Sequence, residues 1–88
     1  MAVHNNPDSM EAFAGALGNF IRDIQNAMSA LNGAYSTLGD DWQDAKKSEF
    51  DENMAEIQRA IVNFSDFSDE SIKYLLHKAQ QLRDYLDS

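Results

Sequence analysis

The sequence of 88 residues predicts an all-α fold: a two-helix antiparallel hairpin that dimerises into a four-helix bundle. Two long segments carry apolar residues at heptad spacing, and a short acidic break around Trp42 separates them near the middle of the chain. The two apolar stripes hold more apolar side chains than one hairpin can bury. The surplus is therefore expected to pack against a second chain.

The first helix is expected over about residues 8–38, after a flexible tail at residues 1–7. Pro7 suits the first turn of a helix, and Asp8 with Glu11 resembles a capping box. Apolar residues then recur every seven residues in three adjacent lines, which together form a stripe roughly 100° wide. The lines are Met10, Leu17, Ile24, Leu31 and Leu38; Phe13, Phe20, Ala27 and Ala34; and Ala14, Ile21, Met28 and Tyr35.

Uncharged polar residues occupy the predicted outer face of this helix. They are Gln25, Asn26, Ser29, Asn32 and Ser36. A solvated helix face usually carries more charge, often in i,i+4 pairs. This face is therefore either a docking surface or a low-charge solvated surface. Three glycines, Gly15, Gly18 and Gly33, are either tolerated weak points of the helix or places where a neighbouring helix approaches closely.

Residues 39–44 are expected to form the turn between the helices. Gly39 is a plausible C-cap, and one of the aspartates that follow, such as Asp44, can cap the second helix. The acids do not have the glycine and terminal glutamate of an EF-hand loop, so capping is favoured over calcium binding. Trp42 is either a large apolar anchor that closes the turn or a partly exposed recognition residue.

The second helix is expected over about residues 44–87. Its heptad pattern runs through Phe50, Met54, Ile57, Ile61 and Phe64, and exposed pairs such as Lys47 with Asp51 support it. The heptad phase slips over residues 63–70. Either a kink at 65–68 accommodates the slip within one helix, or the helix breaks and Ser68 caps a third segment.

Composition excludes several classes of function. The net charge of -8 opposes binding to nucleic acid or to an anionic membrane, since both need a basic surface. There is no cysteine, no run of about 20 apolar residues and no signal-peptide pattern. The two histidines, His4 and His77, stand far apart, and no phosphate loop or nucleophile pattern is present. We therefore expect no enzyme activity, no cofactor and no metal site.

The expected binding residues fall into two groups. The turn motif consists of Trp42, Asp44 and Phe50. The helical interface comprises Leu17, Phe20, Ile21, Ile24, Met28, Leu31, Tyr35, Leu38, Met54, Ile57, Ile61 and Phe64. These residues share the heptad lines of the two helices, so they are expected to form the core of the bundle.

The segment from Leu38 to Ala45, with Phe50 eight residues after Trp42, resembles the turn of the WXG-motif superfamily. These are the small early-secreted-antigen-like proteins of bacterial type VII secretion systems. The resemblance extends to the chain length, the two long helices, the acidic charge and the missing signal peptide. It implies antiparallel four-helix dimers, with Trp42 and Phe50 at the positions of the motif tryptophan and the later aromatic residue.

Two positions depart from the family pattern. Asp44 replaces the motif glycine, and the C-terminal tyrosine followed by an acid four residues later is missing, since Tyr74 has Lys78 at that place. The resemblance implies a virulence-associated factor or secretion partner, secreted without a signal peptide, that pairs with itself or with a similar hairpin. Secretion machinery or a larger effector are the further expected partners. The alternative is a cytoplasmic adaptor or targeting chaperone for a larger effector.

Overall fold

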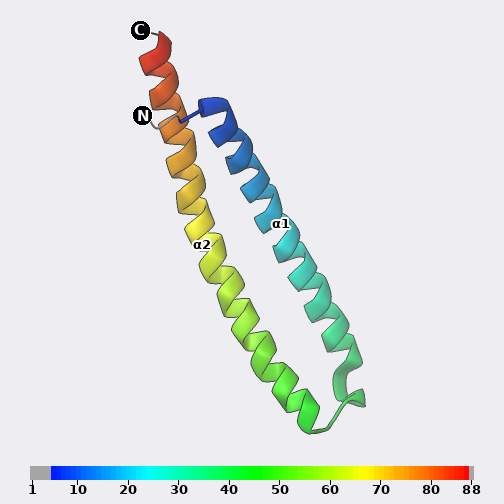
Figure 1. Cartoon of the computed structure of the whole chain (residues 1–88). Helices are drawn as coiled ribbons and strands as arrows, with labels where there is room; N and C mark the ends of the chain where they lie inside the picture. Colours follow the sequence, from blue (N-terminus) through cyan, green and yellow to red (C-terminus); the bar gives the residue numbers. More distant parts are fainter. Residues whose placement is uncertain (1–4, 88) are drawn as a thin grey trace.

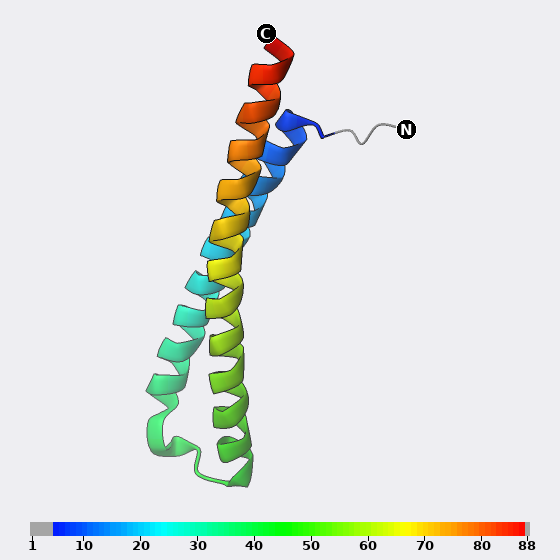
Figure 2. The same cartoon turned by 90° about the vertical axis from the view of Figure 1, so that its left-hand side faces the viewer.

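Two long helices joined by a short turn make up the computed structural model, which describes residues 5–87. Helix α1 spans Pro7–Leu38, the 3-10 helix η1 spans Gly39–Asp41, and α2 spans Ala45–Asp87. The helices run antiparallel as a hairpin, and α2 continues past the beginning of α1 (Figures 1 and 2). The predicted all-α two-helix hairpin is confirmed. The predicted tail residues 1–4, including His4, lie outside the described residues.

Asn6 is the N-cap of the first helix, and the predicted capping box is wrong. The Asn6 Oδ1 atom accepts hydrogen bonds from the backbone N–H groups of Asp8, at 2.9 Å, and of Ser9, at 3.1 Å. Pro7 follows at the first helical position, where a missing N–H costs no hydrogen bond. Asp8 and Glu11 are drawn instead to Arg83 on α2.

At the other end of α1, Gly39 is the C-cap, as expected. Its φ of 54° and ψ of -129° lie in a region that only glycine adopts without strain, and its N–H bonds to the Tyr35 carbonyl. The chain then passes through η1 to Trp42, which is extended at φ -128° and ψ 106°. The turn thus depends on one glycine to reverse the chain.

Helix α2 continues through residues 65–68 as one helix (Figure 1). It contains no glycine or proline, so no residue in it breaks the backbone hydrogen-bond ladder. Ser68 does not cap a third segment. It is fully buried, and Ser65 retains only 8% of its exposure. Both small side chains lie within the helix pair, which explains why the apolar phase slips here.

The seam between the helices buries few large side chains. Its buried apolar residues are Ala14, Ile21, Met54 and Ala79. Gly18 faces α2, where an added Cβ atom would make ordinary van der Waals contact with Ile72 Cδ1 at 3.7 Å, whereas Gly15 and Gly33 have open space around them. None of the three glycines marks a close approach of the two backbones. The molecule measures 66 × 23 × 17 Å, with a radius of gyration of 19.6 Å. A compact domain of this length has a radius near ~12 Å. The hairpin therefore has a seam but no central core.

Within residues 5–87, neither helix contains an apolar stretch suited to crossing a bilayer. The same residues hold no cluster of three or more histidine, cysteine or acidic side chains with the geometry of a metal site.

Candidate partner-binding face and turn

The two edges of the helix seam differ in chemistry. Along one edge, Gln25 Nε2 donates to Ser65 Oγ at 3.0 Å, and Gln58 Nε2 donates to Asn32 Oδ1 at 2.9 Å. The sequence pattern predicts that Gln25 and Asn32 lie on the outer face of the first helix, but their side chains contact Ser65 and Gln58 on α2. Part of the uncharged polar face therefore belongs to the hairpin itself, where it fixes the register of the two helices.

Along the other edge, an apolar groove lies open to solvent. Its walls are Phe20 and Ile24 from α1 and Ile57, Ala60, Ile61 and Phe64 from α2. Phe20 and Phe64 meet across it edge to face, with ring centroids 6.2 Å apart. The groove thus joins the two helices into one continuous apolar surface.

This surface extends toward both ends of the hairpin. A hollow toward the turn includes Phe50, Ile57 and Ala60, and another toward the open end includes Phe67 and Tyr74. Heptad spacing adds Phe13 to the line of Phe20, and Leu31 and Leu38 to the line of Ile24. We call the set the apolar face: Phe13, Phe20, Ile24, Leu31, Leu38, Ile57, Ala60, Phe64, Phe67 and Tyr74.

The expected helical interface divides between the seam and this face. Ile21 and Met54 are buried in the hairpin. Five others are half-buried: Leu17, Ile24, Met28, Tyr35 and Ile61. The remaining five are exposed: Phe20, Leu31, Leu38, Ile57 and Phe64. The interface set omitted Phe13, Phe67 and Tyr74, which are 59%, 63% and 63% exposed. The phase slip at residues 63–70 obscured the last two, whereas Phe13 stood in a heptad line and could have been included.

At the turn, three aromatic rings form a cluster. Phe50 lies between Trp42 and Tyr35, with ring centroids 5.6 Å and 5.3 Å away, respectively. Trp42 is half-buried, so it anchors the turn and still presents part of its ring to solvent. The two other turn-motif residues, Asp44 and Phe50, both contact Trp42.

Asp44 performs two roles at the start of α2. Its Oδ1 atom accepts the indole N–H of Trp42 at 3.0 Å and the backbone N–H of Lys47 at 3.0 Å. The second bond caps α2, as the sequence predicted for one of the aspartates. The first holds the Trp42 ring against the helix that Asp44 begins. A glycine at this position would supply neither bond.

A polar network ties α1 to α2 next to the aromatic cluster. The Tyr35 hydroxyl donates to Asp51, and Lys47 Nζ lies 3.2 Å from Asp51 Oδ2 and 5.7 Å from the Tyr35 ring centre. The hydrogen bond from Tyr35, together with that from Lys47, lowers the pKa of Asp51. The bond that Tyr35 donates raises its own pKa, and the bond to Asp51 raises the pKa of Lys47.

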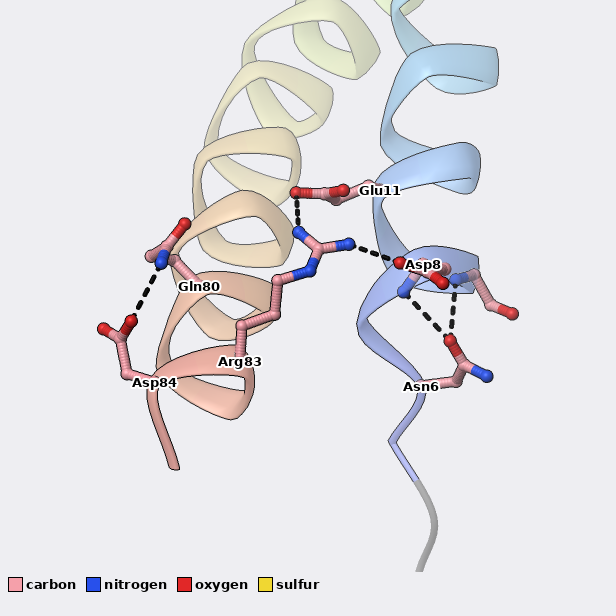
Figure 3. Close-up of polar contacts among 7 residues, drawn as sticks. Asn6, Asp8, Glu11, Gln80, Arg83 and Asp84 are labelled. Atoms are coloured by element: carbon pink, nitrogen blue, oxygen red, sulfur yellow. Dashed lines mark hydrogen bonds and ion pairs between the residues drawn. The ribbon is translucent and has the colours of Figure 1, made fainter. Parts of the chain in front are cut away.

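At the open end, Arg83 clips α2 to the first turn of α1. Its guanidinium group donates to Glu11 and to Asp8, as Figure 3 shows. The hydrogen bond from Arg83 lowers the pKa of Glu11. Sequence periodicity did not indicate this clip, because its members lie more than 70 residues apart and pair only once the register is set.

The described residues thus present an apolar face along the seam and an aromatic cluster at the turn. The family model described as "Proteins of 100 residues with WXG" matches residues 3–85. No curated protein and no solved structure gave a significant match. Since the family match covers almost the whole chain, the protein belongs to this WXG family of small helical proteins associated with type VII secretion.

Proposed function

We propose that this WXG-family chain is a non-catalytic substrate or secretion partner of a type VII secretion system, and that its activity is to bind another helical hairpin. The observation that carries the proposal is the unpartnered apolar face. Among the described residues, twelve large hydrophobic side chains are exposed, whereas only Ile21 and Met54 of that size are buried. A soluble monomer rarely exposes so continuous an apolar surface.

The turn supplies the second part of the proposal. Trp42 directly follows η1 in the turn that joins the two helices, at the end of the hairpin, and the bond to Asp44 holds its ring in place. We propose that the secretion machinery binds the partly exposed Trp42 ring after the hairpin has paired with another hairpin. Asp44 then takes the place of the family glycine by orienting the ring.

The direct test is export from the native host. The protein would be measured in cell pellet and culture medium, with and without the secretion ATPase. ATPase-dependent appearance in the medium, without a lysis marker, is the expected result. Trp42→Ala should reduce export more than it reduces helicity measured by circular dichroism. Val62→Ala, which shortens an exposed side chain outside both the apolar face and the turn, is the matched control for that variant.

Retention in the cytosol of both strains would reject the secreted-substrate proposal. A pull-down from the same host would then test the adaptor alternative. Capture of a large effector through the apolar face would identify the chain as a cytoplasmic adaptor. Capture of a similar small hairpin would retain the secretion-partner role.

A further inference from the structure

Toward the open end of the hairpin, two members of the apolar face lie on the side of α2 that points away from α1. Ile72 faces Gly18 of α1 and Ala79 is fully buried, so these two residues of α2 mark the side next to α1. Successive residues of an α-helix are about 100° apart, so Tyr74 lies about 200° around α2 from Ile72. Phe67, seven residues before Tyr74, lies on the same outer side. Both rings are 63% exposed.

Phe67 and Tyr74 border a hollow that has the geometry of a hole for one side chain of another helix. Its lining includes Phe67, Glu70, Ser71 and Tyr74, at positions i, i+3, i+4 and i+7. Four residues at this spacing form the hole that receives a knob when two helices pack together. The Ser71 hydroxyl donates to the Phe67 carbonyl at 2.9 Å, so it does not require a polar group from the knob. The hole therefore suits an apolar side chain.

One heptad further along, the same side of α2 is basic. The next four residues at this spacing are Tyr74, His77, Lys78 and Gln81. Residues 71–83 carry three of the chain's seven Lys and Arg side chains and one of its two histidines, but no acid, although the net charge of the chain is -8. A knob at this second position is therefore favoured to be a carboxylate.

From this arrangement we infer that the outer side of α2 is a second docking site, and that its occupant is an acidic amphipathic helix of another protein. A large apolar side chain of that helix fills the hole between Phe67 and Tyr74. A carboxylate one heptad away bonds to Lys78, since both helices advance about 10 Å in seven residues at about 1.5 Å per residue. The site goes beyond the proposed function, because the groove between Phe20 and Phe64 lies along the seam, on a different side of α2.

The charges around the site favour a protein helix over an anionic bilayer. Glu70 lines the hollow itself, and Glu56, fourteen residues earlier, lies on the same side of α2. A bilayer presents anionic headgroups to the whole side of the helix, so it would meet these carboxylates as well as Lys78. A partner helix can place its carboxylates opposite Lys78 alone.

A titration followed by nuclear magnetic resonance tests the site on the ¹⁵N-labelled full chain. The probe is an alanine-rich helical peptide with one central leucine and a glutamate one heptad to either side, so that its direction on α2 does not matter. A matched peptide carries lysines in place of the glutamates. We expect shifts of the backbone amides concentrated in residues 67–81, and about twofold to fivefold tighter binding of the glutamate peptide.

Three variants of α2 test the assigned contacts. Tyr74→Ala removes one wall of the hole and should weaken binding at least about tenfold, as expected for a central aromatic contact. Leu76→Ala is the matched control, since Leu76 is exposed two residues away on the opposite side of α2, and it should leave binding unchanged. Lys78→Glu should reverse the preference, so that the lysine peptide binds more tightly. Circular dichroism should show unchanged helicity in all three.

Several results would overturn this inference. They are the absence of shifts at millimolar peptide, shifts centred on the groove of Phe20 and Ile24, and equal binding of the two peptides. Binding to phosphatidylglycerol vesicles that is lost in Tyr74→Ala would assign the outer side of α2 to a membrane instead. Export is measured separately, so a chain that is exported but does not bind the glutamate peptide would keep the proposed function and lose this site.

Discussion

Asp44 shows how one side chain can define the turn. Its carboxylate accepts the Trp42 indole N–H and also caps α2 at Lys47. In the family pattern a glycine stands at this position. Asp44 supplies a carboxylate that accepts the Trp42 indole N–H, whereas glycine has no side chain to accept that hydrogen bond.

We predict that variants of Asp44 separate these two roles. Asp44→Ala should lower the free energy of unfolding by about 1 kcal/mol through loss of the cap, whereas Asp44→Gly should cost only a few tenths of that through the cap. Both should release the indole and shift Trp42 fluorescence to longer wavelength. Asp44→Asn keeps an oxygen acceptor and is the control. An unchanged emission spectrum in Asp44→Ala would contradict the assigned bond.

Two buried serines on α2 make a matched pair with opposite expected effects. Ser65 Oγ accepts a bond from Gln25, whereas the fully buried Ser68 hydroxyl has no partner among the described residues. We predict that Ser68→Ala stabilises the protein by about 1 kcal/mol, and that Ser65→Ala destabilises it by about 0.5–1 kcal/mol. Urea unfolding at fixed protein concentration measures both. Equal destabilisation by the two variants would mean that Ser68 is hydrogen-bonded in solution.

At the scale of helices, polar contacts hold the hairpin at its two ends and hydrogen bonds set its register between them. Arg83 bonds to Asp8 and Glu11 at the open end, and Tyr35 with Lys47 bonds to Asp51 near the turn. The buried seam between these ends is thin. The end contacts therefore limit how far the two helices can slide or fray.

We predict that acid weakens these end contacts. The lowered pKa values of Glu11 and Asp51 mean that the unfolded chain binds protons first, at its ordinary values near ~4. Their stabilisation is therefore complete above that pH and is lost as the pH falls through the lower folded values. Arg83→Met removes the partner of Glu11 and should reduce the loss of stability between neutral pH and pH ~3. If wild type and Arg83→Met lose the same stability on acidification, the pairing of Arg83 with Asp8 and Glu11 is not the cause of that loss.

The heptad lines were sufficient to predict both helices, because periodicity is a local property of the sequence, and the short break between them predicted the antiparallel arrangement. They were not sufficient to assign each line to the seam or to the exposed face. The stripe on α1 is wide enough to serve two neighbours, so Ile21 lies in the seam while Phe20 lies on the apolar face. Asn6 caps α1, whereas Asp8 lies in the first turn of that helix and pairs with Arg83 from the far end of the chain.

At the scale of the whole molecule, the apolar face and the negative charge act against each other. Each copy has a net charge of -8, and Glu56 and Glu70, fourteen residues apart on α2, line hollows of the apolar face. Pairing of two copies brings these charges closer. We predict that the dimer tightens as salt rises from low to physiological concentration, because added ions screen the repulsion. Dissociation constants measured across that range would show the opposite trend if ion pairs held the dimer together.

The central claim is that the free hairpin is incomplete and pairs through its apolar face. Sedimentation equilibrium of the purified chain alone tests it most directly, since the method measures mass independently of the elongated shape. At physiological salt and micromolar concentration we expect a mass twice that of the 9.9 kDa chain. The variant Phe20→Ala, which truncates an exposed ring of the apolar face, should shift toward the single-chain mass. A fully helical wild-type monomer over the whole micromolar range would contradict self-pairing and leave the apolar face to a different partner.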